Sequence, residues 1–468
     1  MSLALRDATA SEPGVTPASP HGGKDKNWAQ VTLTGWGRAR RAECLAARPE
    51  RLRELRDAVA APPEGRSLLA YGAGRSYGDV ALNSGGAAVL TGRLDRMLEF
   101  DPATGRLVVE PGVTFSDLLR AFLPHGFVVP VSPGTGFATL GGAVANDVHG
   151  KNHHHAGSFG DHLDWLEILL PDGRLLRASE VENAELFRAT IGGLGLTGIV
   201  TALCLRLARV PSNALMVRRR RIGHLDEFLA GFEAAAQASY SVGWIDAAAR
   251  GASLGRGVLE TAEPSPDSIA QPPRRPRRVP FDLPGWSLNP VTVRAFNAAY
   301  WRRVPAGGVE AREAYDRFLY PLDALADWNR LYGRAGFHQF QCVVPFENGS
   351  ATLRRLLEAV AQEGSGASPL AVLKAMGRKG RGLLSFPRPG WTLALDMAAR
   401  PGVPAVFARL ERITLDAGGR IYLAKDALLS PEGFAAMYPD ADRFRRIRAE
   451  FDPNGRLCSD LARRVGLA

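Results

Sequence analysis

The chain has 468 residues and a formal charge of +10, with 46% hydrophobic and 23% charged residues. This length and composition favour two or three globular domains with large cores, and argue against a disordered chain. The 58 basic residues are scattered among 48 acidic ones. The charge could indicate nucleic acid or a membrane surface as a partner, but the scatter favours a generally basic surface, and an anionic substrate or cofactor is a compatible second reason.

Cysteine usage and hydropathy set further limits. Cys44, Cys204, Cys342 and Cys458 lie far apart without a Cys-x-x-Cys pair, which argues against a zinc knuckle or a disulfide framework. The N-terminus lacks the apolar core of a secretory signal, and there is no apolar run of about 18 residues that could span a membrane. We expect a cytoplasmic protein whose contact with a membrane or the cell envelope would be peripheral.

The first part of the chain predicts a tail, a helix and a strand that leads into a glycine loop. Residues 1–27 are rich in Pro, Gly and Ser and are expected to be disordered. A helix is predicted over residues 49–60 and a buried strand over 67–71. The glycine loop 72–79 follows that strand directly, an arrangement by which several folds hold a pyrophosphate. Its spacing misses the Rossmann G-x-G-x-x-G, and the next residues favour a turn and a strand over a helix.

Residues 132–160, SPGTGFATLGGAVANDVHGKNHHHAGSFG, are the most unusual stretch of the chain. A backbone with so little side-chain bulk can lie flat against a ligand and turn its N–H groups toward an anion. Residues 139–146 predict the entry to a short helix. The alternative, a flexible linker, does not explain the apolar side chains Leu140, Val144, Val148 and Phe159.

Short strands, turns and helices surround this stretch. A helix is expected over residues 115–122 and another over 185–191. A hairpin turn at 171–174 joins two predicted strands, and a third glycine loop, GGLGLTG at 192–198, runs into a buried strand. The predicted strands of this region cover residues 107–110, 128–131, 163–170 and 175–178.

From residue 211 the pattern changes to amphipathic helices that alternate with strands, which predicts a second α+β domain. The predicted helices cover 225–236 and 353–363, and the predicted strands 241–246, 339–345 and 392–397. Residues 263–290 contain QPPRRPRRVPFDLPGW and cannot form a core element. They are either a loop over the substrate mouth or a surface excursion. A final helix is expected over 431–437 and a turn at 452–455.

Three glycine loops, each attached to a strand, suggest one extended ligand held by backbone groups. YGAGRSYGD, PGTGFATLGGAVANDVHGKNHHHAGSFGDHL and LFRATIGGLGLTGIV resemble the FAD-binding domain of vanillyl-alcohol-oxidase-type (PCMH-type) flavoproteins. The resemblance covers about residues 31–210. It implies an α+β, two-domain FAD-linked oxidase, with a PCMH-type FAD-binding domain at 28–210 and an α+β substrate (cap) domain at 211–419. Residues 420–468 would then return to the FAD domain.

The resemblance also implies how FAD is held. In these flavoproteins the first loop wraps the pyrophosphate, the central stretch lines the isoalloxazine, and the third loop contacts the adenine side. Many members attach FAD covalently through a histidine at the position of Arg75, so a non-covalent FAD is implied here. The cofactor-binding residues implied in this way are Tyr71, Gly72, Ala73, Gly74, Arg75, Ser76, Tyr77, Gly78, Pro133, Gly134, Thr139, Leu140, Gly141, Gly142, Asn146, Asp147, His149, Gly198, Ile199 and Tyr422.

Among these flavoproteins the chain most resembles the decaprenylphosphoryl-β-D-ribose 2-oxidase family, the flavin half of a ribose-to-arabinose epimerase. The matching segments are GRSYGD at 74–79, HGKNHH at 149–154, HQFQ at 338–341, YLAKD at 422–426 and SDLARR at 459–464. They extend the resemblance over nearly the whole chain after residue 28. One departure is Ala394 in GWTLALD, where mycobacterial members carry a cysteine, so the substrate pocket is expected to differ.

The chemistry of alcohol oxidation points to Lys425 in YLAKD as the first catalytic candidate. Hydride leaves the carbinol for the flavin, and the hydroxyl proton must also be removed. A lysine desolvated beside the flavin can act as a base through a lowered pKa, or stay charged and polarise the oxygen. An exposed surface lysine is the alternative, although Ile421 and Leu423 flank it at strand spacing. Tyr77 and His149 are the other catalytic candidates.

Polar residues of the second domain are candidates for substrate binding. Gln339 and Gln341 alternate with Phe340 and so point to one face, which suits a polyhydroxylated sugar or a solvated strand. Lys374 could meet a substrate phosphate, or lie on a helix surface. The complete predicted set of substrate-binding residues is Lys151, Trp244, Gln339, Gln341, Lys374 and Lys425.

The histidines do not favour a metal site. Adjacent histidines have poor geometry for zinc, and no carboxylate or cysteine is spaced to complete a site. His149 and Lys151 are expected to hydrogen-bond flavin or substrate.

The sequence therefore predicts an FAD-dependent oxidase of a sugar hydroxyl that acts on a polyprenylphosphoryl-ribose. Its keto product would pass to a separate NAD(P)H-dependent short-chain reductase. The alternatives are an oxidase of a soluble sugar, sugar alcohol or nucleoside, and a basic nucleic-acid- or surface-binding protein that has kept the fold without the chemistry. The intact glycine loops and the absence of a basic helix or RNP-like motif argue against the last.

Overall fold

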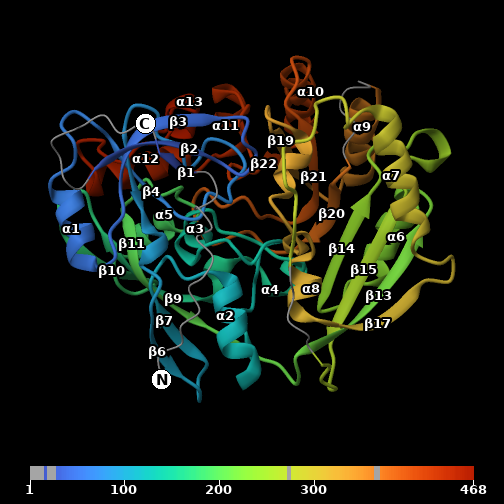
Figure 1. Ribbon diagram of the computed structural model, residues 1–468, viewed down its shortest axis with the longest axis horizontal. Helices are drawn as coiled ribbons and strands as arrows, with labels where there is room; N and C mark the ends of the chain where they lie inside the picture. The colour runs from blue at the N-terminus through green and yellow to red at the C-terminus, as the bar shows by residue number, and fades with distance from the viewer. Residues whose placement is uncertain (1–14, 18–27, 271–275, 363–368) are drawn as a thin grey trace.

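A computed structural model describes residues 15–17, 28–270, 276–362 and 369–468. Figure 1 shows two lobes side by side, one built from the N-terminal half of the chain together with the C-terminal helices, and one from the middle of the chain. Both lobes combine helices with sheets. The predicted α+β, two-domain class is confirmed.

The first lobe begins with a small mixed sheet in the order β1-β2-β3-β5-β4. Strands β3 (Arg41–Ala47), β5 (Ala87–Leu90) and β4 (Leu68–Tyr71) are parallel, and helix α1 (Leu52–Ala60) makes the crossover between β3 and β4. Strand β2 (Ala29–Thr34) pairs antiparallel with β1 (Val15–Pro17). Residues 15–17 are thus a strand and not part of a disordered tail. The rest of the predicted tail lies outside the described residues.

The second sheet of this lobe is antiparallel, in the order β10-β9-β11-β7-β6. Its core consists of apolar side chains from the strands and from helix α2 (Phe115–Phe122), which Thr114 and Asp117 cap reciprocally. The remaining elements are β6 (Met97–Asp101), β7 (Arg106–Val109), β8 (Phe127–Val128), α3 (Leu140–Ala145), α4 (His153–Ala156), β9 (Leu163–Leu169), β10 (Leu175–Ser179), α5 (Ala184–Thr190), β11 (Ile199–Arg206) and β12 (Ala208–Arg209).

The second lobe is built on one antiparallel sheet, which has eight strands in the described part of the chain. Their order is β17 (Val309–Ala314), β13 (Ala214–Ile222), β15 (Gly257–Pro264), β14 (Tyr240–Ile245), β20 (Ala371–Met376), β21 (Gly390–Ala398), β19 (Phe337–Val344) and β22 (Arg420–Ile421). Helices α6 (Leu225–Ala234), α9 (Gly349–Gln362) and α10 (Val403–Asp416) cover one face (Figure 1). Because side chains alternate along a strand, the same strands turn a second set of residues to the opposite face, toward the first lobe.

A long excursion follows β15. Its described part holds β16 (Arg277–Arg278), which pairs with β18 (Leu325–Ala326), and helix α7 (Pro290–Arg302). Asn289 caps α7, and Pro290 occupies the first helical position, where a missing N–H costs nothing. Helix α8 (Tyr315–Leu319) comes after β17. Residues 271–275 of the predicted loop lie outside the described residues.

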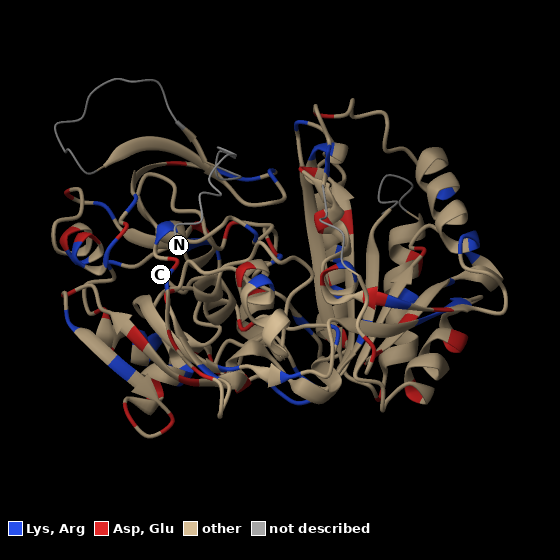
Figure 2. Ribbon diagram, turned by 60° about the horizontal axis from the view of Figure 1, so that its bottom comes forward, with Lys and Arg blue, Asp and Glu red and all other residues tan. Residues whose placement is uncertain are grey.

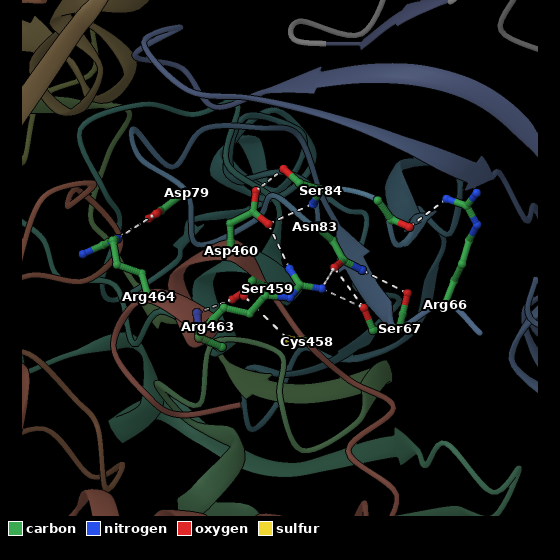
Figure 3. A network of polar contacts seen from close by, with 12 residues as sticks. Arg66, Ser67, Asp79, Asn83, Ser84, Cys458, Ser459, Asp460, Arg463 and Arg464 are labelled. Carbon is green, nitrogen blue, oxygen red and sulfur yellow. Dashed lines mark hydrogen bonds and ion pairs between the residues drawn. The ribbon is translucent and has the colours of Figure 1, made fainter. Parts of the chain in front are cut away.

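The C-terminal segment returns to the first lobe through α11 (Pro431–Met437), α12 (Ala441–Phe451) and α13 (Asp460–Arg464). Residue 457 lies beside β4, where Leu68 N–H donates to Arg456 O and Cys458 N–H donates to Leu68 O. On α13, Asp460 accepts from Ser84, and Arg463 donates to Ser67 and Asn83 (Figure 3).

Arg464 at the end of α13 joins three of the sequence motifs. Its guanidinium donates to both oxygens of Asp79, at 2.8 and 2.9 Å, and to Asp426 at 2.8 Å. Both carboxylates are buried. The two loops that they anchor touch, since a Cβ added to Gly78 would lie 1.6 Å from the Asp426 carbonyl oxygen. GRSYGD, YLAKD and SDLARR therefore form one unit around a single arginine.

Replacing Arg464 tests this unit. Removing one partner of a buried ion pair leaves uncompensated charge, so we expect Arg464→Ala to lower the free energy of unfolding by about 3–5 kcal/mol. Arg120 is the control, because its pair with Asp117 on α2 is exposed. Arg120→Ala should cost about 1 kcal/mol or less. Equal losses for the two variants in urea unfolding would contradict a special role for Arg464.

Candidate active site

A cavity of about 1240 Å³ lies between the free face of the eight-stranded sheet and the glycine loops of the first lobe. It exceeds the usual range of about 300–1,000 Å³ for small-molecule sites. Side chains of β19, β20 and β21 form one wall, and the three glycine loops form the other. Residues of the described excursion, among them Leu283, Leu288 and Phe296, complete its rim. The predicted loop therefore borders the cavity.

Most of the predicted cofactor residues line this cavity. They are Gly72, Ala73, Gly74, Arg75, Ser76, Tyr77, Pro133, Gly134, Thr139, Gly141, Gly142, Asn146, His149, Gly198, Ile199 and Tyr422.

Four predicted cofactor residues do not line the cavity and have structural contacts instead. Tyr71 donates its hydroxyl to Thr34 O, and Gly78 packs on the Asp426 loop. Leu140 belongs to the apolar core, and Asp147 accepts from Ser385 Oγ and Gly160 N. Motif spacing places these residues near the ligand, but only packing decides which way each side chain points.

Lys425 is half-buried and packs against Tyr77, with Nζ 3.5 Å from the centroid of the phenol ring, a cation–π contact. Burial lowers the pKa of Lys425, and Asp396 opposes that shift. The strand spacing that we inferred around Lys425 is wrong. Strand β22 ends at Ile421, and the chain then turns, with Lys425 N donating to Tyr422 O at 3.0 Å. The side chain is placed by this turn and not by a strand.

Asp396, a carboxylate whose charge acts on Lys425, was not predicted as a site residue. It is fully buried on β21, directly opposite Gln339 on β19, and Gln339 donates to its Oδ1. Tyr332 adds a second side-chain hydrogen bond. Burial raises the pKa of Asp396, while Gln339 and Lys425 lower it. Alternation along β21 could have revealed it, because Thr392, Ala394 and Asp396 share one face.

The two glutamines face the cavity as predicted, and Phe340 between them is in the core. Gln341 Nε2 lies 3.1 Å from His149 Nε2 and 3.2 Å from Thr392 Oγ1. Burial and then Lys374 hold the pKa of His149 well below its usual range, so the ring is neutral.

Three lysines share this cavity, namely Lys151, Lys374 and Lys425. Lys374 lies on strand β20, which corrects the helix-surface alternative. Burial, followed by repulsion from Lys151 and Lys425, lowers its pKa to about 7. Lys151 donates to Phe318 O and lies 4.0 Å from the centroid of the Phe318 ring, and burial lowers its pKa to about 8. Half-buried like charges of this kind indicate a site for an anion.

Comparison with known proteins gives the family. A sequence model described as FAD binding domain matches residues 45–179, and one described as D-arabinono-1,4-lactone oxidase matches residues 392–465. Decaprenylphosphoryl-beta-D-ribose oxidase of Mycolicibacterium smegmatis is 35% identical over 93% of this chain and 97% of its own length. The chain belongs to this oxidase family.

More distant relatives share the flavoprotein architecture. L-gulono-1,4-lactone dehydrogenase of Mycobacterium tuberculosis is 26% identical over 91% of this chain and 96% of its own length. L-gulonolactone oxidase of Mus musculus is 26% identical over 34% of this chain and 36% of its own length. The protein is an FAD-dependent oxidoreductase of the CH–OH class. No helix among the described residues is long and apolar enough to cross a membrane.

The cavity of this oxidase fits FAD. Buried polar atoms of three lining residues, Arg75 Nε, Asn146 Oδ1 and His149 Nδ1, have no hydrogen-bond partner among the described residues. Buried polar atoms are normally paired, so these atoms are consistent with a bound polar ligand. Gly74 and Gly195 line the cavity with φ of 61° and 76°, a backbone region that glycine enters at little cost. A metal-binding group of His, Cys, Asp or Glu is absent from the residues described.

Arg75 is the cation that the first glycine loop places at the cavity wall. Its guanidinium lies between two rings, 4.3 Å from the Trp36 centroid and 4.9 Å from that of Phe137. Burial lowers its pKa, and Asp323 opposes this shift. Neither ring was predicted. Trp36 lies outside the three glycine motifs, and Phe137 lies between the glycines of the second motif. The sandwich holds the guanidinium in place at the cavity wall.

Replacement of Arg75 should weaken the binding of FAD. A charge-assisted hydrogen bond contributes about 1.5–3 kcal/mol, so we expect Arg75→Met to raise the FAD dissociation constant about 10- to 100-fold. Fluorescence titration of the apoprotein measures this constant. Arg93→Met, at an exposed ion pair with Glu50, is the control and should change nothing. An unchanged constant for Arg75→Met would remove Arg75 from the cofactor site.

Proposed function

We propose that this oxidase converts the 2-hydroxyl of a polyprenylphosphoryl-β-D-ribose to a ketone. The observation that carries the proposal is that one cavity joins two glutamines, three half-buried lysines and an apolar extension. The glutamines suit a sugar, the lysines suit a phosphate, and Trp244, Leu370 and Phe296 suit a lipid. The name of the mycolicibacterial relative supports the same substrate.

The enzyme's own residues have distinct roles in this proposal. FAD, held without a covalent link, supplies the hydride acceptor when bound. Lys425 lies beside the reacting hydroxyl and takes its proton, or polarises its oxygen. Gln339 and Gln341 orient the ring hydroxyls. Lys374 and Lys151 compensate the phosphate charge, and Tyr77 holds the Lys425 ammonium group through its ring.

The product would be the keto sugar, with both electrons on the flavin and the hydroxyl proton released. Reduction of that ketone on the other face would invert the carbon and complete an epimerisation. We assign that second step to a separate short-chain reductase that uses NAD(P)H.

Anaerobic flavin reduction tests the substrate. We expect a lipid-linked phosphoribose to bleach the flavin much faster than free ribose or a nucleoside at equal concentration. Faster reduction by a free sugar, sugar alcohol or nucleoside would replace the proposed substrate by a soluble one. Acid precipitation tests the cofactor linkage, because a non-covalent flavin moves to the supernatant.

Lys425→Ala should slow the chemical step without loss of FAD. General acid–base assistance contributes about 10²- to 10⁴-fold, so anaerobic flavin reduction should slow by that factor. Lys425→Arg should not restore it, because a guanidinium stays protonated and has a different shape. Lys379→Ala, at an exposed pair with Asp440, is the control. Near wild-type reduction by Lys425→Ala would transfer the role to His149 or Tyr77.

Asp396 is a positioning residue that acts through Lys425, and its substitution should move a pH profile. The carboxylate stabilises the Lys425 ammonium, so Asp396→Asn should lower the lysine pKa further. In a plot of the flavin-reduction rate against pH, the limb that reports the Lys425 pKa then moves to lower pH. This holds whether the amine or the ammonium form of Lys425 is active. A purely structural Asp396 would change the rate without moving that limb.

The lowered pKa of Lys374 leads us to expect that substrate binding depends on pH. Its pKa is lowered to about 7, so the ammonium is present below that pH and is lost above it. Affinity for the phosphorylated substrate should therefore fall as pH rises from about 6 to about 8. Lys374→Met should bind weakly at both pH values and lose this dependence. An unchanged profile in the variant would place the phosphate elsewhere.

A further inference from the structure

The excursion that borders the cavity also carries several large apolar side chains that are exposed to solvent. Four large apolar side chains within residues 281–296 are exposed, namely Phe281 (62%), Trp286 (76%), Val291 (73%) and Phe296 (51%). Exposed apolar residues grouped in this way mark interaction surfaces. Helix α7 is exposed over most of its surface, since only Val293 and Asn297 of its residues are buried.

Arginine residues dominate the charge of this surface. Residues 283–309 contain no aspartate or glutamate, while Arg294, Arg302 and Arg303 are exposed on or directly after α7 (Figure 2). Arg277 and Arg278 of β16 are also exposed, although Arg278 pairs with Asp327, and Asp282 is committed to an ion pair with Arg38. A helix with apolar and arginine residues on its exposed side is suited to the interface of an anionic bilayer.

The patch is continuous with the interior of the cavity. Phe296, half exposed, lies 6.0 Å from Tyr300 between ring centroids, and Tyr300 lies 4.5 Å from Trp244. All three line the cavity, and Trp244 is buried in it. An aromatic path thus leads from the apolar surface to the sheet wall that bears Lys374.

We propose that loop 279–289 and helix α7 form a docking surface for an anionic lipid bilayer, from which the substrate's prenyl chain enters along Phe296, Tyr300 and Trp244. The lipid-linked substrate is taken from the proposed function, and the inference rests on it in that respect. Docking at this surface brings the cavity mouth to the layer in which such a lipid resides. The enzyme then does not need to carry the whole prenyl chain through water.

Vesicle sedimentation of the FAD-loaded full chain tests the surface without turnover. We expect binding to vesicles of phosphatidylcholine and phosphatidylglycerol, weak binding to phosphatidylcholine alone, and release by salt. The double variant Arg294→Gln/Arg302→Gln should bind about 30-fold more weakly, at about 5-fold per arginine. Trp286→Ser/Val291→Ser should lose binding by about 10-fold or more through its apolar contribution. None of these four residues lines the cavity.

Matched controls separate this surface from the general basic charge. Arg53→Gln/Arg56→Gln removes two exposed arginines from α1, which lies at the opposite end of the molecule (Figure 1), and Leu98→Ser/Val181→Ser removes two exposed apolar side chains elsewhere. Both should bind as the unsubstituted chain does. Equal loss in the controls, or normal binding by either patch variant, overturns the proposal.

Two further measurements keep the outcomes distinct. Self-association that the patch variants abolish, without any vesicle binding, would identify the surface as a contact between copies and overturn the proposal. Flavin reduction by the lipid-linked ribose in detergent measures the proposed function separately. Reduction in detergent without vesicle binding therefore refutes the docking surface alone.

Discussion

The active site depends on the ion-pair cluster around Arg464. One guanidinium binds a carboxylate from the first glycine loop and another from the turn that carries Lys425. Tyr77 N–H donates to Ala424 O between these two anchors, and Gly78 has no room for a side chain there. The Lys425–Tyr77 contact is thus set by a helix at the far end of the chain. A buried cluster of this kind gives one defined geometry, because any displaced member would leave an unpaired charge.

Side chains alternate between the two faces of the eight-stranded sheet, so the same strands supply both the apolar core and the cavity wall. Phe340, Leu373 and Leu393 pack under α6, α9 and α10, while Gln341, Lys374 and Thr392 on the same strands face the cavity. The rigid core behind the sheet holds the polar side chains in place, as catalytic geometry requires. Ala394 lies opposite Gln341 in the register and also faces the cavity. Its small side chain leaves room beside Gln341 at the cavity wall.

The electrostatics of the cavity follow from burial. For Lys151, Lys374 and Lys425 the largest cause of the lowered pKa is loss of water, and repulsion between the amines adds to it for Lys374. Asp396 is the buried carboxylate that opposes this effect at Lys425. Clustered amines with lowered pKa values are unfavourable by themselves, and an anion in the cavity would offset this cost. This is the reason for their phosphate-binding role in the proposed function.

Much of this protein can be read from local sequence. Periodicity identified α2, α5, β9 and the turn at 171–174 closely, because capping, hairpin chemistry and amphipathic spacing act within a few residues. The three glycine loops indicated one extended cofactor, and the alternation of Gln339 and Gln341 indicated a shared face. These features depend only on neighbours in the chain, and the family resemblance adds the identity of the cofactor.

Other features were decided by contacts between residues far apart in the chain. The sequence left Lys374 either at a substrate phosphate or on the surface of a helix. Only the pairing of β20 with β14 and β21 places it on the cavity wall. Lys425 is placed by a turn that Tyr422 begins by donating its N–H to Gln341 O, about eighty residues away in sequence. Alternation along β21 gives the face of Asp396, but only the folded chain brings Asp396 opposite Gln339 and close enough to affect the pKa of Lys425. Local patterns specify elements and faces, whereas register and long-range ion pairs specify which side chains meet, and no window of sequence contains that information.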